Sequence, residues 1–149
     1  MRLLSRSLAL LVFLGMAAAS QAAPSKETLE IVTTTGSHPF EVEVVRSPPD
    51  MEKGLMFRRY MPEDRGMLFD FKKPQPVMMW MKNTYLPLDM VFIDGAGKVI
   101  NVAEHAEPLS EAIIPSGGPA VGVLEVNAGV AAKIGLKRGD RVRASIFSK

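Results

Sequence analysis

Alternating apolar and polar residues in the first half of the chain predict β-strands. Residues 40–45 (Phe-Glu-Val-Glu-Val-Val) alternate between apolar and acidic side chains, as expected for a strand with one face in water. Residues 29–33 are also rich in β-branched side chains, and residues 36–39 (Gly-Ser-His-Pro) favour a hairpin-like connection between the two segments. Two further apolar runs, 67–71 and 77–81, are separated by a Lys/Pro-rich loop and predict two buried strands.

The second half of the chain continues this pattern. Residues 88–94 and 98–103 flank Gly-Ala-Gly at 95–97, which predicts a β-hairpin. Residues 121–126 form another apolar run, and residues 141–147 alternate as a last strand.

Two short helices are expected between these strands. Ser47 predicts the start of a helix over 48–57, because its side chain can cap and the two prolines that follow fit the first turn. Asn127 predicts the start of a second helix over 128–134. The fold class is therefore α+β, mostly β: a compact antiparallel or mixed β-barrel-like domain with two short helices. A parallel α/β fold would need long crossover helices, which the pattern does not provide.

The N-terminus has the pattern of a secretory signal peptide. Arg2 and Arg6 precede an apolar run at 8–19 that is too short to span a bilayer, and the small residues at 20–22 suit cleavage at their end. We therefore expect a signal peptide over 1–22 and a single β-rich domain over 23–149 in a periplasmic or secreted protein. The alternative is a retained membrane anchor, but no basic stop-transfer residues follow the run.

Charge and cysteine content limit the classes of partner that we expect the protein to bind. The chain has 18 basic and 16 acidic residues, and removal of Arg2 and Arg6 with the signal leaves 16 of each. A neutral mature domain lacks the positive excess that drives binding to nucleic acid or anionic membranes. The chain has no cysteine, which agrees with a core-stabilised fold in an oxidising compartment. We expect a monomer without nucleic acid, cofactor or membrane insertion after signal cleavage.

Polar side chains interrupt the apolar sequence around residue 80 and mark a candidate site. Lys82, Asn83 and Thr84 follow the apolar run 77–81, and Asp89 is a lone carboxylate in the next run. Unpaired polar groups cost about 1–3 kcal/mol when buried, so such groups are usually paired, solvated in a cleft, or functional. We hypothesise one pocket for a small-molecule, peptide or sugar ligand that is polar or anionic. Its residues are Arg58, Trp80, Lys82, Asn83, Thr84 and Asp89.

Three alternatives remain open at this point. In a structural scaffold, Asp89 would pair with Arg58 or Lys82, and Asn83 and Thr84 would cap the turn. In a hydrolase or transferase, Asp89 would act as general base and Lys82 as electrostatic stabiliser. The eight methionines after residue 50 also suit a Cu(I)-binding protein, although methionine is equally a flexible core filler. The sequence contains no serine-hydrolase elbow, phosphate-binding glycine loop or dinucleotide fingerprint.

Six short motifs follow one another along the chain: Gly54-Leu55-Met56-Phe57-Arg58, Gly66-Met67-Leu68-Phe69, Trp80-Met81-Lys82-Asn83-Thr84, Pro87-Leu88-Asp89, Val123-Leu124-Glu125-Val126 and Gly139-Asp140. Together and in this order they resemble the domain of unknown function 192 family. The resemblance extends from about residue 40 to the end and implies a compact β-rich fold in an often exported protein. It implies no established activity, so the residues themselves must supply any hypothesis about a site.

Overall fold

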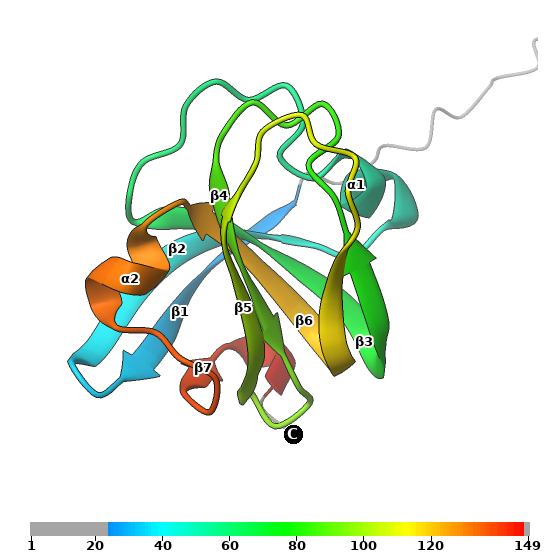
Figure 1. Ribbon diagram of the computed structural model, residues 1–149. Helices are drawn as coiled ribbons and strands as arrows, with labels where there is room; N and C mark the ends of the chain where they lie inside the picture. Colours follow the sequence, from blue (N-terminus) through cyan, green and yellow to red (C-terminus); the bar gives the residue numbers. More distant parts are fainter. Residues whose placement is uncertain (1–23, 148–149) are drawn as a thin grey trace, which may run out of the picture.

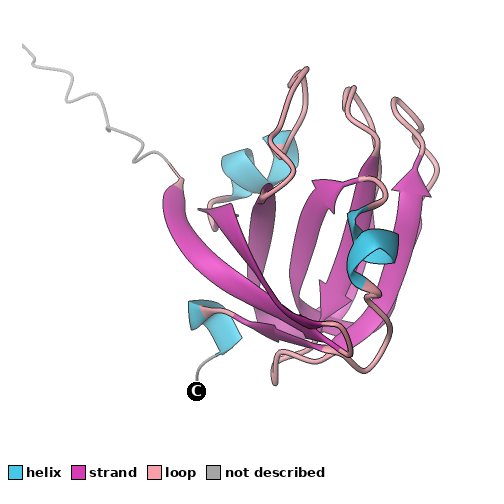
Figure 2. Cartoon of the chain, turned by 90° about the vertical axis from the view of Figure 1, so that its left-hand side faces the viewer, coloured by secondary structure: helices cyan, strands magenta, loops and turns pink. Residues whose placement is uncertain are grey.

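A single curled sheet of seven strands forms the body of the protein. Figure 1 shows the computed structural model, which describes residues 24–147; the signal peptide expected over 1–22 lies outside them. The strands lie in the order β5-β4-β6-β3-β2-β1-β7 and curl into a half-barrel (Figure 2). Their bounds are β1 (Ser25–Thr33), β2 (Gly36–Val45), β3 (Arg65–Met79), β4 (Leu88–Ile93), β5 (Val99–Ala106), β6 (Ile114–Asn127) and β7 (Arg141–Arg143). The α+β, mostly β prediction is confirmed.

Backbone hydrogen bonds bring the two edge strands of the sheet together at one end of the barrel. The Val99 amide donates to the Asp140 carbonyl at 2.8 Å, and the Val142 amide donates to the Gly97 carbonyl at 2.7 Å. These bonds link the β4–β5 hairpin to β7, at opposite ends of the strand order. The exposed sheet edges are thereby shortened, which protects the fold from edge-to-edge pairing with other chains.

The sheet is mixed because α1 (Pro48–Lys53) and the loop after it return the chain parallel to β2. Glu41–Val45 of β2 pair in parallel with Arg65–Phe69 of β3, whereas the other strand pairs are antiparallel. Ser47 caps α1 as predicted, accepting a hydrogen bond from the Asp50 amide. The helix is shorter than the predicted 48–57, because Gly54 leaves helical geometry with φ +46°.

The second helix also differs in its start. α2 (Val130–Ile134) begins after Gly129 without a side-chain cap and ends at Gly135, which adopts the left-handed conformation. Asn127 does not cap it, since its side-chain amide donates instead to the Met61 and Pro62 carbonyls, at 2.9 and 3.1 Å. The chain ends in a 3-10 turn, η1 (Ser145–Phe147), rather than a strand reaching residue 147.

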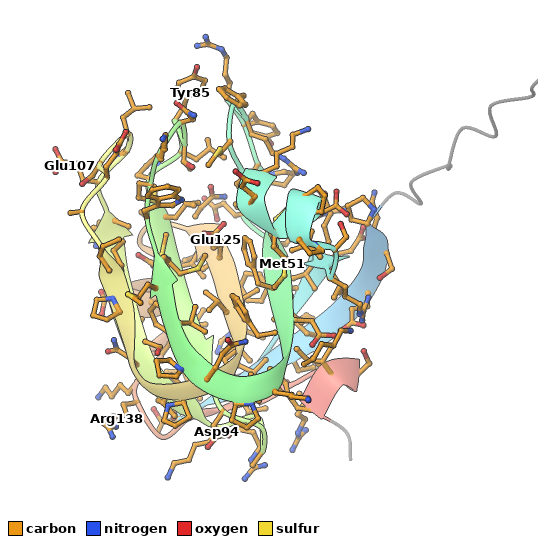
Figure 3. The ribbon with its side chains drawn as sticks, turned by 90° about the vertical axis from the view of Figure 1, so that its right-hand side faces the viewer. Met51, Tyr85, Asp94, Glu107, Glu125 and Arg138 are labelled. Carbon is orange, nitrogen blue, oxygen red and sulfur yellow. The ribbon has the colours of Figure 1, made fainter. Side chains whose placement is uncertain are left out.

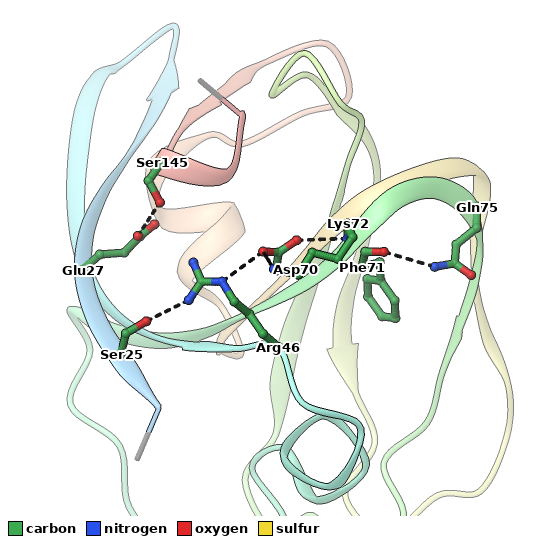
Figure 4. Close-up of polar contacts among 8 residues, drawn as sticks. All are labelled: Ser25, Glu27, Arg46, Asp70, Phe71, Lys72, Gln75 and Ser145. Carbon is green, nitrogen blue, oxygen red and sulfur yellow. Dashed lines mark hydrogen bonds and ion pairs between the residues drawn. The ribbon is translucent and has the colours of Figure 1, made fainter. Parts of the chain in front are cut away.

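The prediction of two strands at 67–71 and 77–81 is wrong, because β3 runs through both segments. Only the first part of β3 pairs with β2. The prolines of β3 lie in its later part, where the edge of the strand on the β2 side has no pairing with β2. The register with β6 shifts between Asp70 and Gln75, where Lys72 has φ +67°. Asp70 fixes this bend by accepting from the Lys72 amide and ammonium and from Arg46 (Figure 4). Burial alone would raise the pKa of Asp70, but these hydrogen bonds hold it below its ordinary value.

The two faces of the curled sheet bury separate apolar clusters. Successive residues of β6 alternate between them: Leu124 and Val126 belong to the cluster that packs on α2, and Val123 belongs to the cluster beside α1. Glu125 therefore lies on the same face as Val123. This alternation places a carboxyl group inside an apolar cluster.

Three loops gather at one end of the molecule, above the cluster beside α1. They connect α1 to β3 (54–64), β3 to β4 (80–87) and β5 to β6 (107–113), and they project from the same end in Figures 1 and 2. The Phe57 amide donates to the Asn83 carbonyl at 2.9 Å, and the Leu109 amide donates to the Thr84 carbonyl at 3.1 Å. The middle loop is thus hydrogen-bonded to both of its neighbours.

Candidate functional site

A cavity of about 300 Å³ lies between α1, β3 and the start of the loop after β3. Its lining is mainly apolar, with three aromatic rings and four thioethers. We call it the Glu125 cavity. The lining residues are Met51, Glu52, Lys53, Gly54, Leu55, Met56, Phe69, Phe71, Met78, Met79, Trp80, Thr84 and Glu125. A mostly apolar hollow with a few polar groups is typical of a small-molecule site.

Glu125 is the buried polar group of this cavity. In the sheet register it lies between Met67 of β3 and Met90 of β4, and its side chain is 4% exposed. No hydrogen bond or ion pair from another residue of 24–147 reaches its carboxyl group. Burial without a compensating donor raises the pKa of Glu125 to about 8. In Figure 3, Glu125 lies in the interior with Met51 of α1 beside it, toward the end that carries Tyr85.

The other polar groups of the cavity differ in depth. Thr84 is buried, and its hydroxyl donates to the Lys82 carbonyl at 3.1 Å. Glu52 and Lys53 are both exposed, on α1. The depth of the cavity therefore presents one carboxyl and one hydroxyl oxygen, and the exposed part of its lining carries two opposite charges.

A second hollow of about 330 Å³ adjoins the first and shares Glu52, Lys53, Met56 and Trp80 with it. We call it the Lys82 hollow, because Lys82 and Asn83 also line it. The Lys82 ammonium lies 5.1 Å from the centre of the Trp80 ring, a cation–π contact.

The structure brings four of the six predicted site residues to these adjoining hollows. Trp80 lines both, Thr84 lines the Glu125 cavity, and Lys82 and Asn83 line the Lys82 hollow. Arg58 is not among them. Its guanidinium binds both carboxylate oxygens of Glu43, at 2.5 and 2.7 Å, and lines a different hollow beside β2.

Asp89 lies outside both hollows and is fully buried. One carboxylate oxygen accepts from the His105 amide and the other from the Ala131 amide, each at 2.9 Å. The carboxylate therefore ties β4 to the end of β5 and to α2. Asp89 thus neither lines the predicted pocket nor pairs with Arg58 or Lys82. Two backbone amides from distant segments donate hydrogen bonds to its carboxylate instead.

Glu125 was not predicted as a site residue, although the sequence carried a signal for it. It is an acidic residue within the apolar run 121–126, the same pattern that singled out Asp89. The run alone does not say which of the two carboxylates has partners in the folded chain.

The methionines of the described chain divide into two groups. Met61, Met67, Met81 and Met90 are buried in the apolar core, as expected of core fillers. The other four line the Glu125 cavity, and they are Met51, Met56, Met78 and Met79. Residues 24–147 contain no group of three or more His, Cys, Asp or Glu side chains that could hold a metal ion. Cu(I) binding by thioethers stays a prediction.

None of the helices in the described part of the chain has the length and apolar character needed to cross a membrane.

Comparisons with known proteins place the chain in a family. The model of the DUF192 family, described as "Uncharacterized ACR", matches residues 30–144. The crystal structure of a proposed transcription regulator from Sinorhizobium meliloti 1021 is similar, with 47% identity and a TM-score of 0.81 over 85% of this chain and 99% of that one. A protein of unknown function from Novosphingobium aromaticivorans DSM 12444 shares 36% identity, with a TM-score of 0.78 over 87% of this chain and 99% of that one. No curated protein matches significantly. The chain belongs to the DUF192 family.

Proposed function

We propose that this protein is an exported binding module that holds a small molecule in the Glu125 cavity. The observation that carries the proposal is the buried carboxyl of Glu125, which has no hydrogen-bond partner in residues 24–147 and lines a cavity. A buried polar group without a partner costs free energy that a bound ligand would recover. Export rests on the signal peptide expected at 1–22.

The cavity supports binding better than catalysis. The alternative hydrolase or transferase needs Asp89 open to a cleft, but Asp89 is sealed against two amides. The described lining of the Glu125 cavity contains no histidine or serine, and its lysine, Lys53, is exposed on α1. No second group is therefore placed beside Glu125 to share a proton transfer. A single carboxyl in an apolar wall selects and orients a ligand instead.

The ligand we propose has an apolar body and one polar group. Three aromatic rings and four thioethers would contact the body, and Glu125 would contact the polar group. An anionic ligand held by Arg58 is not part of the proposal, because Glu43 already occupies that guanidinium. The Lys82 hollow offers room for a further polar substituent next to the cavity.

DNA binding is not carried over from the Sinorhizobium neighbour. The sequence beyond the signal has equal numbers of basic and acidic residues, and that balance does not favour binding to a polyanion.

Nuclear magnetic resonance with a fragment library tests the proposal on the processed chain, residues 23–149. We expect hits that shift the backbone amides of Leu55, Phe69, Thr84 and Glu125 together. Met56→Arg should abolish these shifts, because Met56 lines both hollows. Leu109→Arg is the matched control, since Leu109 is 56% exposed and lines neither hollow. A library that binds elsewhere, or that binds Met56→Arg equally well, would overturn the proposal.

A further inference from the structure

We infer that the ligand of the Glu125 cavity is an organic ammonium ion, a protonated amine carried on an apolar body. This inference rests on the proposed function and names the chemical class that the cavity selects. It follows from the kinds of atoms that the lining side chains present.

The buried polar side chains of the cavity accept hydrogen bonds. The Thr84 hydroxyl has already donated its hydrogen to the Lys82 carbonyl, so its oxygen can only accept from a ligand. The Glu125 carboxylate, once ionised, accepts at both oxygens. A ligand that satisfies the Thr84 hydroxyl and the ionised Glu125 carboxylate together must therefore bring donors, and an ammonium group brings several.

The apolar walls favour a cation for a separate reason. The faces of Phe69, Phe71 and Trp80 are electron-rich and attract cations, and Trp80 already has the Lys82 ammonium 5.1 Å from its ring centre. The thioethers of the four cavity methionines are polarizable and accept weakly. Neither an aromatic face nor a thioether would stabilise an anion.

The charges around Glu125 leave it free to act as the counter-ion. Its cross-strand neighbours on β3 and β4 are Met67 and Met90, which carry no charge. From α1 come Glu52 and Lys53, both exposed and of opposite sign. From the loop after β3 comes Lys82, which lines the adjoining hollow and lies over Trp80.

Binding of an ammonium ion should release a proton from Glu125. Burial raises the pKa of Glu125 to about 8, so the carboxyl is mostly protonated at neutral pH before a ligand binds. The ammonium ion favours the carboxylate, and the carboxyl proton leaves to solvent. Apparent affinity should therefore fall about tenfold for each pH unit below 8 and level off above it.

Matched ligand pairs test the inference by calorimetry on the processed chain. The probes are benzylamine, phenethylamine and hexylamine, each paired with the alcohol of the same carbon skeleton. We expect at least one amine to bind about tenfold or more tightly than its alcohol at pH 8. At pH 6 that amine should bind about fiftyfold more weakly than at pH 8, where the carboxyl is already half ionised, with release of close to one proton in buffers of different ionisation enthalpy.

Two variants locate the effect. Glu125→Gln should lose the preference for amines and the proton release, with folding checked by circular dichroism. Glu111→Gln, which removes an exposed carboxylate of the loop 107–113 that lines neither hollow, should keep both. Alcohols that bind as tightly as amines in the cavity would overturn the ammonium inference and leave the proposed function standing. Failure of every amine while other fragments occupy the cavity would do the same. An amine preference that survives in Glu125→Gln would also overturn it, whereas a cavity that no probe or fragment enters would overturn both.

Discussion

Two buried carboxylates on neighbouring strands have different surroundings. Met90 pairs with Glu125 and Asp89 pairs with Val126, so the two acids lie one register step apart and on opposite faces of the sheet. Asp89 faces the cluster beside α2, where two backbone amides reach it. Glu125 faces the cluster beside α1, where methionine side chains flank it. The supply of donors on each face decides which acid is structural and which is available to a ligand.

Asp89→Asn should destabilise the protein by about 2–4 kcal/mol. The asparagine amide can accept at only one position, so its NH₂ group would face the amide of His105 or Ala131. Urea denaturation measures the loss, and Asp64→Asn, an exposed carboxylate, is the control. Amine binding by the folded fraction should be unchanged. Near-wild-type stability with lost binding would instead place Asp89 in the ligand site.

The stability of the protein should depend on pH through Glu125. Its folded-state pKa of about 8 lies above the ordinary value of 4.5, so between these pH values the folded chain holds a proton that the unfolded chain releases. The free energy of unfolding of the wild type should therefore fall as pH rises through this range, relative to that of Glu125→Gln. The difference should reach up to about 4 kcal/mol at pH 8, measured by urea denaturation. Parallel pH profiles for the two proteins would contradict the raised pKa.

At the scale of elements, the close approach of β3 and β6 forms the floor of the site. Gly66 of β3 pairs with Val126, and a Cβ atom built at Gly66 would lie 2.5 Å from the Glu125 carbonyl oxygen. The glycine is required here by the neighbouring backbone and not by its own dihedral angles. It allows β6 to lie close enough for Glu125 to be held between β3 and β4.

Gly66→Ala should destabilise the protein by about 3 kcal/mol or more, because a strand backbone cannot give way as a flexible side chain can. Thermal and urea denaturation measure the effect. Gly95→Ala is the matched control: its nearest contact is the end of a Val121 side chain at 3.4 Å, so the change should stay within about 0.5 kcal/mol. Equal losses in both variants would show that the β3–β6 approach is not special.

Elements with local signals were predictable, and elements defined by partners were not. Asp94 accepts from the Ala96 and Lys98 amides and Gly97 has φ +78°, so the hairpin at 95–97 follows from its own residues. The length of β3 does not follow from its own residues. Its prolines suggest a break, and the strand continues only because β6 pairs with its far half.

At the scale of the whole molecule, the two ends of the curled sheet differ in structure. Backbone bonds join the β4–β5 hairpin to β7 at one end. Three loops lie at the other end, beside the Glu125 cavity, and the middle loop is hydrogen-bonded to the other two. A sheet whose edges are joined at one end can hold a cavity in a fixed shape, which reduces the cost of ordering the site when a ligand binds.

The proposed export predicts how residues 1–22 are processed. Expressed with residues 1–22 in a bacterial host, the protein should be recovered from the periplasm or the medium with Ala23 as its first residue, as measured by intact mass. Ala22→Arg should block processing, because a small residue is required before the cleaved bond. Gln21→Ala is the control and should be processed normally. A cytoplasmic protein that keeps residues 1–22 would contradict the prediction.

The sequence alone determined the mostly β fold class, the capped start of α1 and the hairpin at 95–97, and it predicts a signal peptide over 1–22. Each depends on periodicity or turn chemistry among residues close in the chain. It also drew attention to the polar segment after Trp80, part of which lines the two hollows.

Only the tertiary structure decided which charged groups are available. Glu43 lies 15 residues from Arg58, and the amide of Ala131 lies 42 residues from Asp89, so their pairing depends on how distant strands come together. Glu125 is left without a partner for the same reason. Whether a buried charge is satisfied depends on donors that only folding brings near it.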